Sequence, residues 1–136
     1  MNASKPLSVT RAKDREAMAQ AVETLCAEYG ATCERNTPLS SCPRSIWCKV
    51  GLDGVGVTVM FDGDRARGRA GQFCMAWLLT GERDKRLSDR FGWVAGGEVN
   101  QYHRGKCTAF AYSYAALLAT LRDCLECIKS GEAFEQ

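Results

Sequence analysis

The chain of 136 residues has a single histidine, three prolines and almost no net charge, with 18 basic against 16 acidic side chains. A formal charge of +2 is too small to indicate a nucleic-acid or membrane partner by itself. No apolar run approaches the roughly 18 residues that a membrane span needs. The N-terminal segment contains no apolar stretch typical of a secretory signal. These absences predict a cytoplasmic protein without a membrane partner.

The motifs that usually accompany catalysis or nucleotide binding are also missing. Neither GxGxxG nor GxxxxGK[ST] occurs, so no glycine-rich loop is available to hold phosphate. Nucleophilic catalysis commonly relies on a histidine base, and His103 is surrounded by no coherent catalytic set. The leading interpretation is therefore a non-enzymatic protein, for which we expect no catalytic residue, no cofactor and no metal.

Cysteine, in contrast, is abundant, with eight residues at positions 26, 33, 42, 48, 74, 107, 124 and 127. A secreted disulfide scaffold is usually shorter and carries a signal peptide. Most of these cysteines stand where small core residues belong. We interpret them as reduced thiols.

Length and composition are those of one globular domain, and we expect a single α+β domain over residues 1–136. Apolar residues recur at spacings of three and four over 10–29, which predicts a helix that ends at Gly30. A second stripe of this kind predicts a C-terminal helix over 112–129, with Cys124 beside its buried positions.

The most informative stretch is residues 46–61, where apolar residues alternate on both sides of Asp53-Gly54. A two-residue Asp-Gly turn predicts a tight hairpin, since both of its positions need positive φ. In that register the eight inward residues form four facing pairs. The pairs are Leu52–Val55, Val50–Val57, Cys48–Val59 and Ile46–Phe61.

Two further strands are expected over 72–80 and 91–94, and residues 31–35 are a candidate for a short additional strand. Residues 96–106 are expected to be irregular. The resulting fold class is α+β: a four-stranded, mostly antiparallel sheet with N- and C-terminal helices, in the order α-β-β-β-β-α. We expect a two-layer sandwich.

One alternative is a zinc- or thiol-dependent small enzyme built on His103, Cys107, Cys124 and Cys127. Zinc accepts a tetrahedral set of three cysteines and one histidine. Against this alternative, zinc knuckles place a CxxC pair on a tight turn, whereas Cys124 and Cys127 fall inside an amphipathic helix. A redox role is disfavoured as well, because a helix C-terminus raises a thiol pKa.

Several residues are candidates for partner binding. Trp47 pairs with Met60 on the hairpin face opposite the eight inward residues. They form an exposed apolar patch if both helices cover the other face, and a covered one if each face carries a helix. Arg65, Arg67 and Arg69 alternate in a polar segment and suit phosphate or carboxylate groups, although a solvated loop is the more common explanation of such a segment. The polar segment with Tyr102, His103 and Arg104 is a further candidate.

Residues 98–108 read EVNQYHRGKCT and precede an amphipathic helix containing LLATL. This stretch, together with the FDGD turn at 61–64, resembles small uncharacterised proteins of proteobacterial prophages and integrative elements, which read roughly V-N-P-Y-H-x-x-K-A-T. The chain departs from that pattern at Gln101 and Cys107. The resemblance covers about a third of the chain. It implies an origin on a mobile element and transfers no catalytic residue.

We therefore expect a small phage or mobile-element protein that binds a host protein or protein complex, and a host-defence inhibitor of the anti-CRISPR kind is one such protein. Besides the zinc or thiol enzyme, the other alternative is a nucleic-acid-binding module that uses the Arg65–Arg69 segment. A homodimer through the exposed sheet face is also compatible with the pattern.

Overall fold

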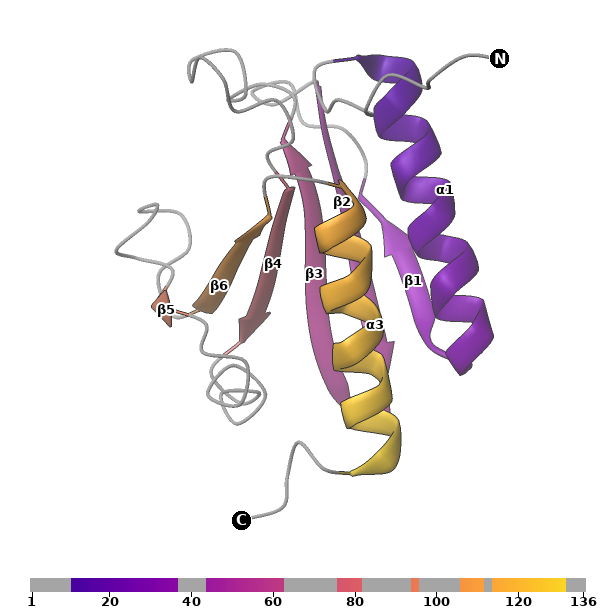
Figure 1. The fold of residues 1–136 in the computed structure, drawn as a ribbon, viewed down its shortest axis with the longest axis vertical. Coiled ribbons are helices and arrows are strands. Elements are labelled where there is room, and N and C mark those ends of the chain that lie inside the picture. Colours follow the sequence, from indigo (N-terminus) through magenta and orange to yellow (C-terminus); the bar gives the residue numbers. More distant parts are fainter. Residues whose placement is uncertain are drawn as a thin grey trace.

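A computed structural model describes residues 11–36, 44–62, 76–81, 94–95, 106–111 and 114–131, with side chains over 11–36, 44–61 and 115–131. The chain is α+β, with two helices and an antiparallel sheet (Figure 1). Along the sequence the elements are α1 (Ala12–Tyr29), β1 (Thr32–Arg35), β2 (Ser45–Leu52), β3 (Val55–Asp62), β4 (Ala76–Gly81), β5 (Val94–Ala95), β6 (Lys106–Ala111) and α3 (Tyr114–Ser130).

Helix α1 follows the predicted stripe, because residues three and four apart share one side of a helix. Its buried residues are Arg15, Met18, Ala19, Val22, Leu25 and Cys26. Gly30 ends the helix in the left-handed conformation, with φ 70°, which glycine adopts without steric cost. The chain then turns directly into β1, and the Ala31 amide donates a 2.9 Å hydrogen bond to the Cys26 carbonyl.

The hairpin of β2 and β3 has the predicted register in all four facing pairs, from Ile46–Phe61 to Leu52–Val55. Asp53 and Gly54 both have positive φ, at 50° and 82°, as a tight two-residue turn requires. Seven of the eight inward residues are buried, and Ile46 is half-buried against the same core. The predicted hairpin is confirmed.

The sheet extends beyond the hairpin on both sides, in the order β1-β2-β3-β4-β6-β5 with antiparallel neighbours. Strand β1 confirms the candidate at 31–35. Strand β4 at Ala76–Gly81 overlaps the strand predicted over 72–80, and β5 at Val94–Ala95 overlaps the one predicted over 91–94, while residues 72–75 and 91–93 lie outside the described residues. Strand β6 was not predicted: alanine and cysteine fill half of Lys106–Ala111, and alanine has little β preference. The predicted count of four strands is therefore too low.

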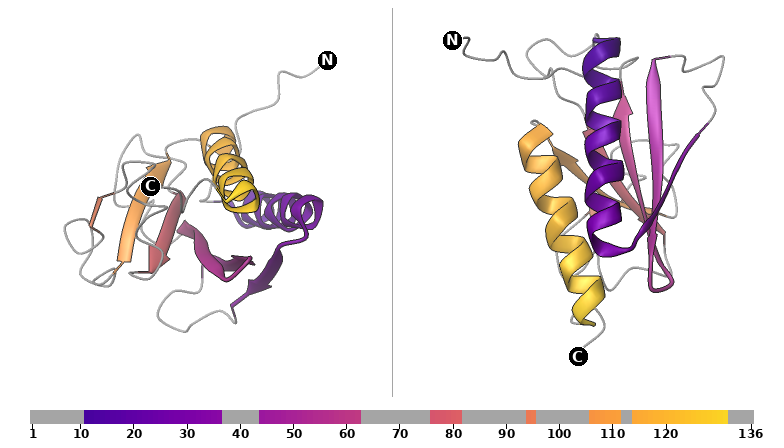
Figure 2. Two further views of the ribbon diagram at one scale, coloured as in Figure 1. Left: turned by 90° about the horizontal axis from the view of Figure 1, so that it is seen from below. Right: turned by 90° about the vertical axis from the view of Figure 1, so that its right-hand side faces the viewer.

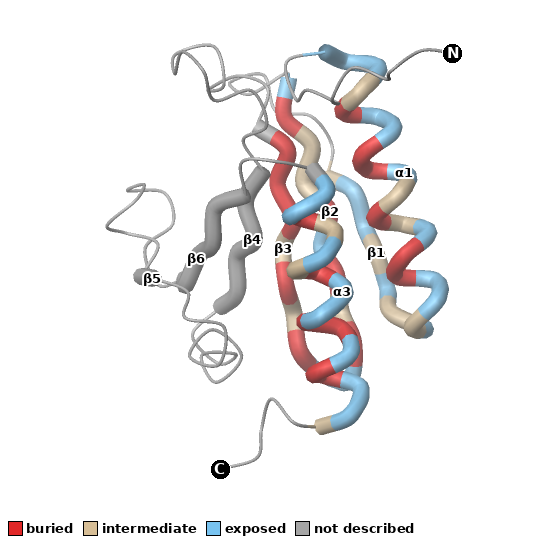
Figure 3. The backbone as a smooth tube through the Cα atoms, in the orientation of Figure 1, coloured by how far each residue is buried: buried red, intermediate tan, exposed pale blue. Residues whose placement is uncertain are grey.

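Both helices lie against the same side of the sheet (Figure 2). The buried stripe of α3 consists of Leu117, Leu121, Cys124, Leu125, Cys127 and Ile128. These residues form one apolar core with the stripe of α1 and the inward residues of the hairpin. Figure 3 shows the resulting pattern, in which buried positions recur along the inner sides of both helices and exposed positions recur along the outer sides.

Polar contacts join the helices at the surface, and one of them is a 3.4 Å hydrogen bond that Lys129 Nζ donates to the Tyr29 carbonyl. The Tyr29 hydroxyl donates to a Glu126 carboxylate oxygen at 2.7 Å, and Arg122 Nη1 donates to Glu28 Oε2 at 3.2 Å. Among the described residues, neither helix has the length and apolarity that crossing a membrane requires.

Candidate functional site

The strongest candidate surface is the side of the sheet that faces away from the helices, here called the helix-free face. Successive side chains of a strand point to opposite sides of a sheet. On β2 and β3 the residues between the core positions therefore form this face: Trp47, Lys49, Gly51, Gly56, Thr58 and Met60. The predicted surface pair Trp47–Met60 is thus on the face that the helices leave uncovered.

The pair differs in exposure from the patch that the sequence suggested. Only 6% of the surface of Met60 is exposed to solvent, and Trp47 is half-buried against the core cluster. The same register row continues through Trp77 of β4 to Phe110 of β6. The burial of Met60 leaves Trp47 as the member of the pair with surface to offer a partner.

Next to this row, the helix-free face is hollowed at the turn end of the hairpin. An open hollow of about 510 Å³ is lined by β1, β2, β3 and the turn between the last two. Gly51 faces Gly56 in the ladder, so neither position contributes a side chain to the floor. A methyl group on Gly51 would come within 2.8 Å of Thr32 Oγ1, which itself donates a 3.2 Å hydrogen bond to the Gly51 carbonyl.

The rim of this hollow is polar and of mixed charge. Glu34 and Lys49 face each other across β1 and β2, and Asp53 projects from the turn. All three are exposed. A backbone floor with a mixed polar rim suits a protein surface or a peptide, because the two glycines allow close approach and the rim has no excess of positive charge. It does not resemble the basic groove that tracks a phosphate backbone.

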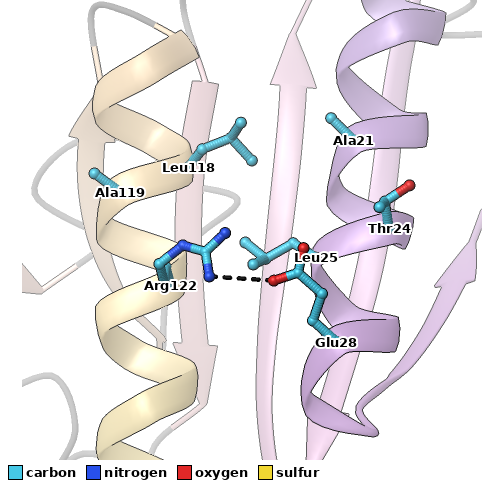
Figure 4. A pocket seen from close by; sticks show the side chains of 7 residues that line it. All are labelled: Ala21, Thr24, Leu25, Glu28, Leu118, Ala119 and Arg122. Carbon is cyan, nitrogen blue, oxygen red and sulfur yellow. Dashed lines mark hydrogen bonds and ion pairs between the residues drawn. The ribbon is translucent and has the colours of Figure 1, made fainter.

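A second, smaller hollow of about 320 Å³ lies between α1 and α3 on the outer surface (Figure 4). Its lining is mostly small and apolar: Ala21, Thr24, Leu25, Leu118 and Ala119, with Glu28 and Arg122 beside them. The two charged residues already pair with each other at 3.2 Å. The lining contains no nucleophile with a base beside it, so this hollow has no evident chemistry.

The proposed zinc and thiol residues are placed only in part. Cys124 and Cys127 are buried in α3, and Cys124 has no exposed surface, which confirms its interpretation as a core residue. Burial raises the pKa of the Cys124 thiol to about 12, so it stays protonated at neutral pH. Cys107 lies on β6, and His103 is outside the described residues. Over the ranges that the structure describes, no group of three or more candidate ligands could hold a metal ion.

The remaining candidates for partner binding also lie outside the described residues. These are Arg65, Arg67 and Arg69, and the trio Tyr102, His103 and Arg104. Their roles stay predictions.

Sequence reasoning missed the glycine-floored hollow, although a signal for it was present. In the alternating hairpin, Gly51 and Gly56 occupy outward positions that directly face each other once the Asp53-Gly54 turn fixes the register. Two glycines at facing outward positions leave bare backbone on that side of a sheet, which often marks the close approach of a ligand or another backbone.

No protein-family model matches the chain, and no curated protein or solved structure is significantly similar to it.

Proposed function

We propose that the chain is a non-enzymatic binding protein that takes a host protein onto the helix-free face. One observation carries the proposal: a glycine-floored hollow with a polar rim lies beside a half-buried tryptophan on the sheet face away from both helices. Tryptophan is among the residues that most often dominate binding energy at protein interfaces. Bare backbone next to it allows close approach of a partner chain.

The proposal relies on the two-layer sandwich that the sequence predicts. In that arrangement the helices form one layer and the sheet the other, which leaves the outer surface of the sheet for a partner. The resemblance to prophage and integrative-element proteins supports a host macromolecule as the target, in the cytoplasm. On the same ground we propose inhibition of a host defence complex as the biological role.

A protein partner is favoured over nucleic acid by the charges around the hollow. Glu34 and Asp53 outnumber Lys49, so the rim as described has no basic excess. Nucleic-acid sites concentrate lysine and arginine, because phosphate neutralisation supplies most of their affinity.

The test is affinity capture from host lysate with tagged full-length chain, followed by titration of the purified partner. The disrupting variants are Trp47→Ala and Lys49→Glu, both on the helix-free face. The matched control is Lys13→Glu, which makes the same charge change on the exposed side of α1. We expect Trp47→Ala to weaken binding at least tenfold, or about 1.4 kcal/mol, and Lys13→Glu to leave it unchanged.

Equal binding by all variants, with each checked for folding, would refute the helix-free face as the contact surface. Capture of nucleic acid, with an affinity that falls steeply with salt, would favour the nucleic-acid module instead. A dimer that Lys49→Glu dissociates would identify the partner as a second copy of the chain.

A further inference from the structure

Three cysteines from three different elements meet at the β1 edge of the core. Cys26 belongs to the last turns of α1, Cys33 to β1 and Cys48 to β2. The thiol of Cys33 interacts with the thiols of both neighbours, and all three are free. Neither the core nor the proposed binding face requires three adjoining thiols, since apolar residues of similar size would fill the same space.

The three thiols differ in their access to solvent. Only 1% of the surface of Cys26 and none of the surface of Cys48 is exposed to solvent, whereas Cys33 is only half-buried on the edge strand. Susceptibility of a thiol to oxidation follows its exposure and its thiolate character. A small oxidant in solution therefore reaches Cys33 before the other two.

The pKa values of all three thiols are raised above the ordinary value. Burial raises the pKa of both Cys26 and Cys48 to about 12. Burial also raises the pKa of Cys33, but hydrogen bonds from the Cys26 and Cys48 thiols act in the opposite direction. Burial remains the largest influence on the Cys33 thiol, so its pKa is raised overall, and the difference among the three thiols rests on their exposure.

Ladder geometry distinguishes the two neighbours as disulfide partners. Cys33 faces Val50 in the β1–β2 ladder while Cys48 faces Arg35, so the two cysteines are diagonal neighbours. Diagonal positions are about 7–8 Å apart, beyond the roughly 6.8 Å between Cα atoms that a disulfide spans. Cys26 lies on α1, outside the β1–β2 ladder, so the ladder spacing does not separate it from Cys33, and its thiol is in hydrogen-bond contact with the Cys33 thiol.

We propose that Cys33 is a peroxide-oxidised modification site and that Cys26 is its resolving cysteine. Hydrogen peroxide oxidises the Cys33 thiol to a sulfenic acid and is itself reduced to water. The Cys26 sulfur then attacks the sulfenic sulfur. The S–S bond forms as the S–OH bond breaks, and the hydroxyl group leaves as a second water with the proton that Cys26 gives up. The product ties the end of α1 to the edge strand β1.

Peptide mapping of the full chain tests this assignment, because Glu28 lies between the two cysteines. The protein is treated with hydrogen peroxide, its remaining thiols are alkylated, and it is cleaved after glutamate. We expect a linked pair of peptides that contains Cys26 and Cys33, is absent before treatment and disappears on reduction. Dimedone, which traps sulfenic acids, should label Cys33 early in the reaction.

Three variants separate the roles. Cys33→Ser should abolish the linked pair, Cys26→Ala should convert the product into a persistent dimedone-reactive Cys33, and Cys48→Ala should still form the Cys26–Cys33 link. A Cys33–Cys48 link in the wild-type chain would overturn the choice of resolving cysteine. A Cys33 that stays reduced and unlabelled by dimedone while other cysteines oxidise would overturn the whole proposal, and neither readout depends on a variant that must fold.

Discussion

The two faces of the β2–β3 hairpin are built from the same sixteen positions, yet they follow opposite rules. On the side toward the helices, every described residue from Cys48 to Phe61 at alternate positions is buried and apolar. One residue further along each strand, the helix-free face carries an exposed lysine, a partly exposed threonine and two glycines. The residues of the first face are the apolar side chains that core packing requires. The glycines and polar side chains of the second face are not explained by core packing. The second face is therefore the better candidate for a functional surface.

The sharpest test of this difference places the same charge on each face at adjacent positions of β3. Val59→Asp buries a carboxylate where no surface is exposed, and we expect a loss of more than about 4 kcal/mol in the free energy of unfolding. Thr58→Asp stands opposite Lys49 on the helix-free face, so a change within about 1 kcal/mol is expected. Urea denaturation followed by circular dichroism measures both. Similar losses for the two variants would contradict the assignment of faces.

Met60 breaks the simple comparison, since it lies on the helix-free face and is nevertheless buried. If its burial is that of a core residue, Met60→Ala should cost about 2–5 kcal/mol, as truncation of a buried methionine does. The same urea titration measures this loss. A cost within about 0.5 kcal/mol would mean that Met60 is a surface residue, and would restore the exposed Trp47–Met60 patch that the sequence suggested.

Local chemistry explains which parts of the fold the sequence predicted. The hairpin was predictable to the residue, because a two-residue turn with positive φ at Asp53 and Gly54 allows one register only. Both helices were predictable from their apolar spacing. Strand β6 was not, because Lys106–Ala111 is held in the sheet by its pairing with β4, and such long-range pairing leaves no local pattern.

The candidate site was less predictable for a related reason. Trp47 and Met60 could be assigned to one face from alternation, but burial depends on what packs over a residue, which alternation does not encode. The contact of Cys26, Cys33 and Cys48 likewise needs α1 to be folded against the β1 edge. Sequence spacing alone gives no reason to group a helical cysteine with two strand cysteines.

The smallest expected effect lies at the rim of the helix-facing side, where an ion-pair cluster joins β1 to α1. Arg35 donates from Nη1 to Glu16 Oε1 at 2.8 Å and from Nη2 to Glu23 Oε1 at 2.6 Å. The hydrogen bond from Arg35 is the largest influence on the pKa of Glu16, which it lowers below the ordinary value of 4.5. All three side chains are partly exposed to solvent, which screens their attraction, so the stabilisation is small.

The sign of the pH dependence follows from the lowered pKa. A carboxyl group that ionises more readily in the folded chain stabilises the fold above its unfolded pKa, and this stabilisation is lost as the pH falls through the folded pKa. In wild-type protein, part of the stability should therefore disappear between pH 4.5 and the lower folded value. Arg35→Ala should flatten this acid limb and return the Glu16 titration, followed by carboxyl NMR, toward 4.5. An unchanged Glu16 titration in Arg35→Ala would show that Arg35 does not stabilise the Glu16 carboxylate. The attachment of β1 to α1 on the helix-facing side would then depend on apolar packing and not on this ion-pair cluster.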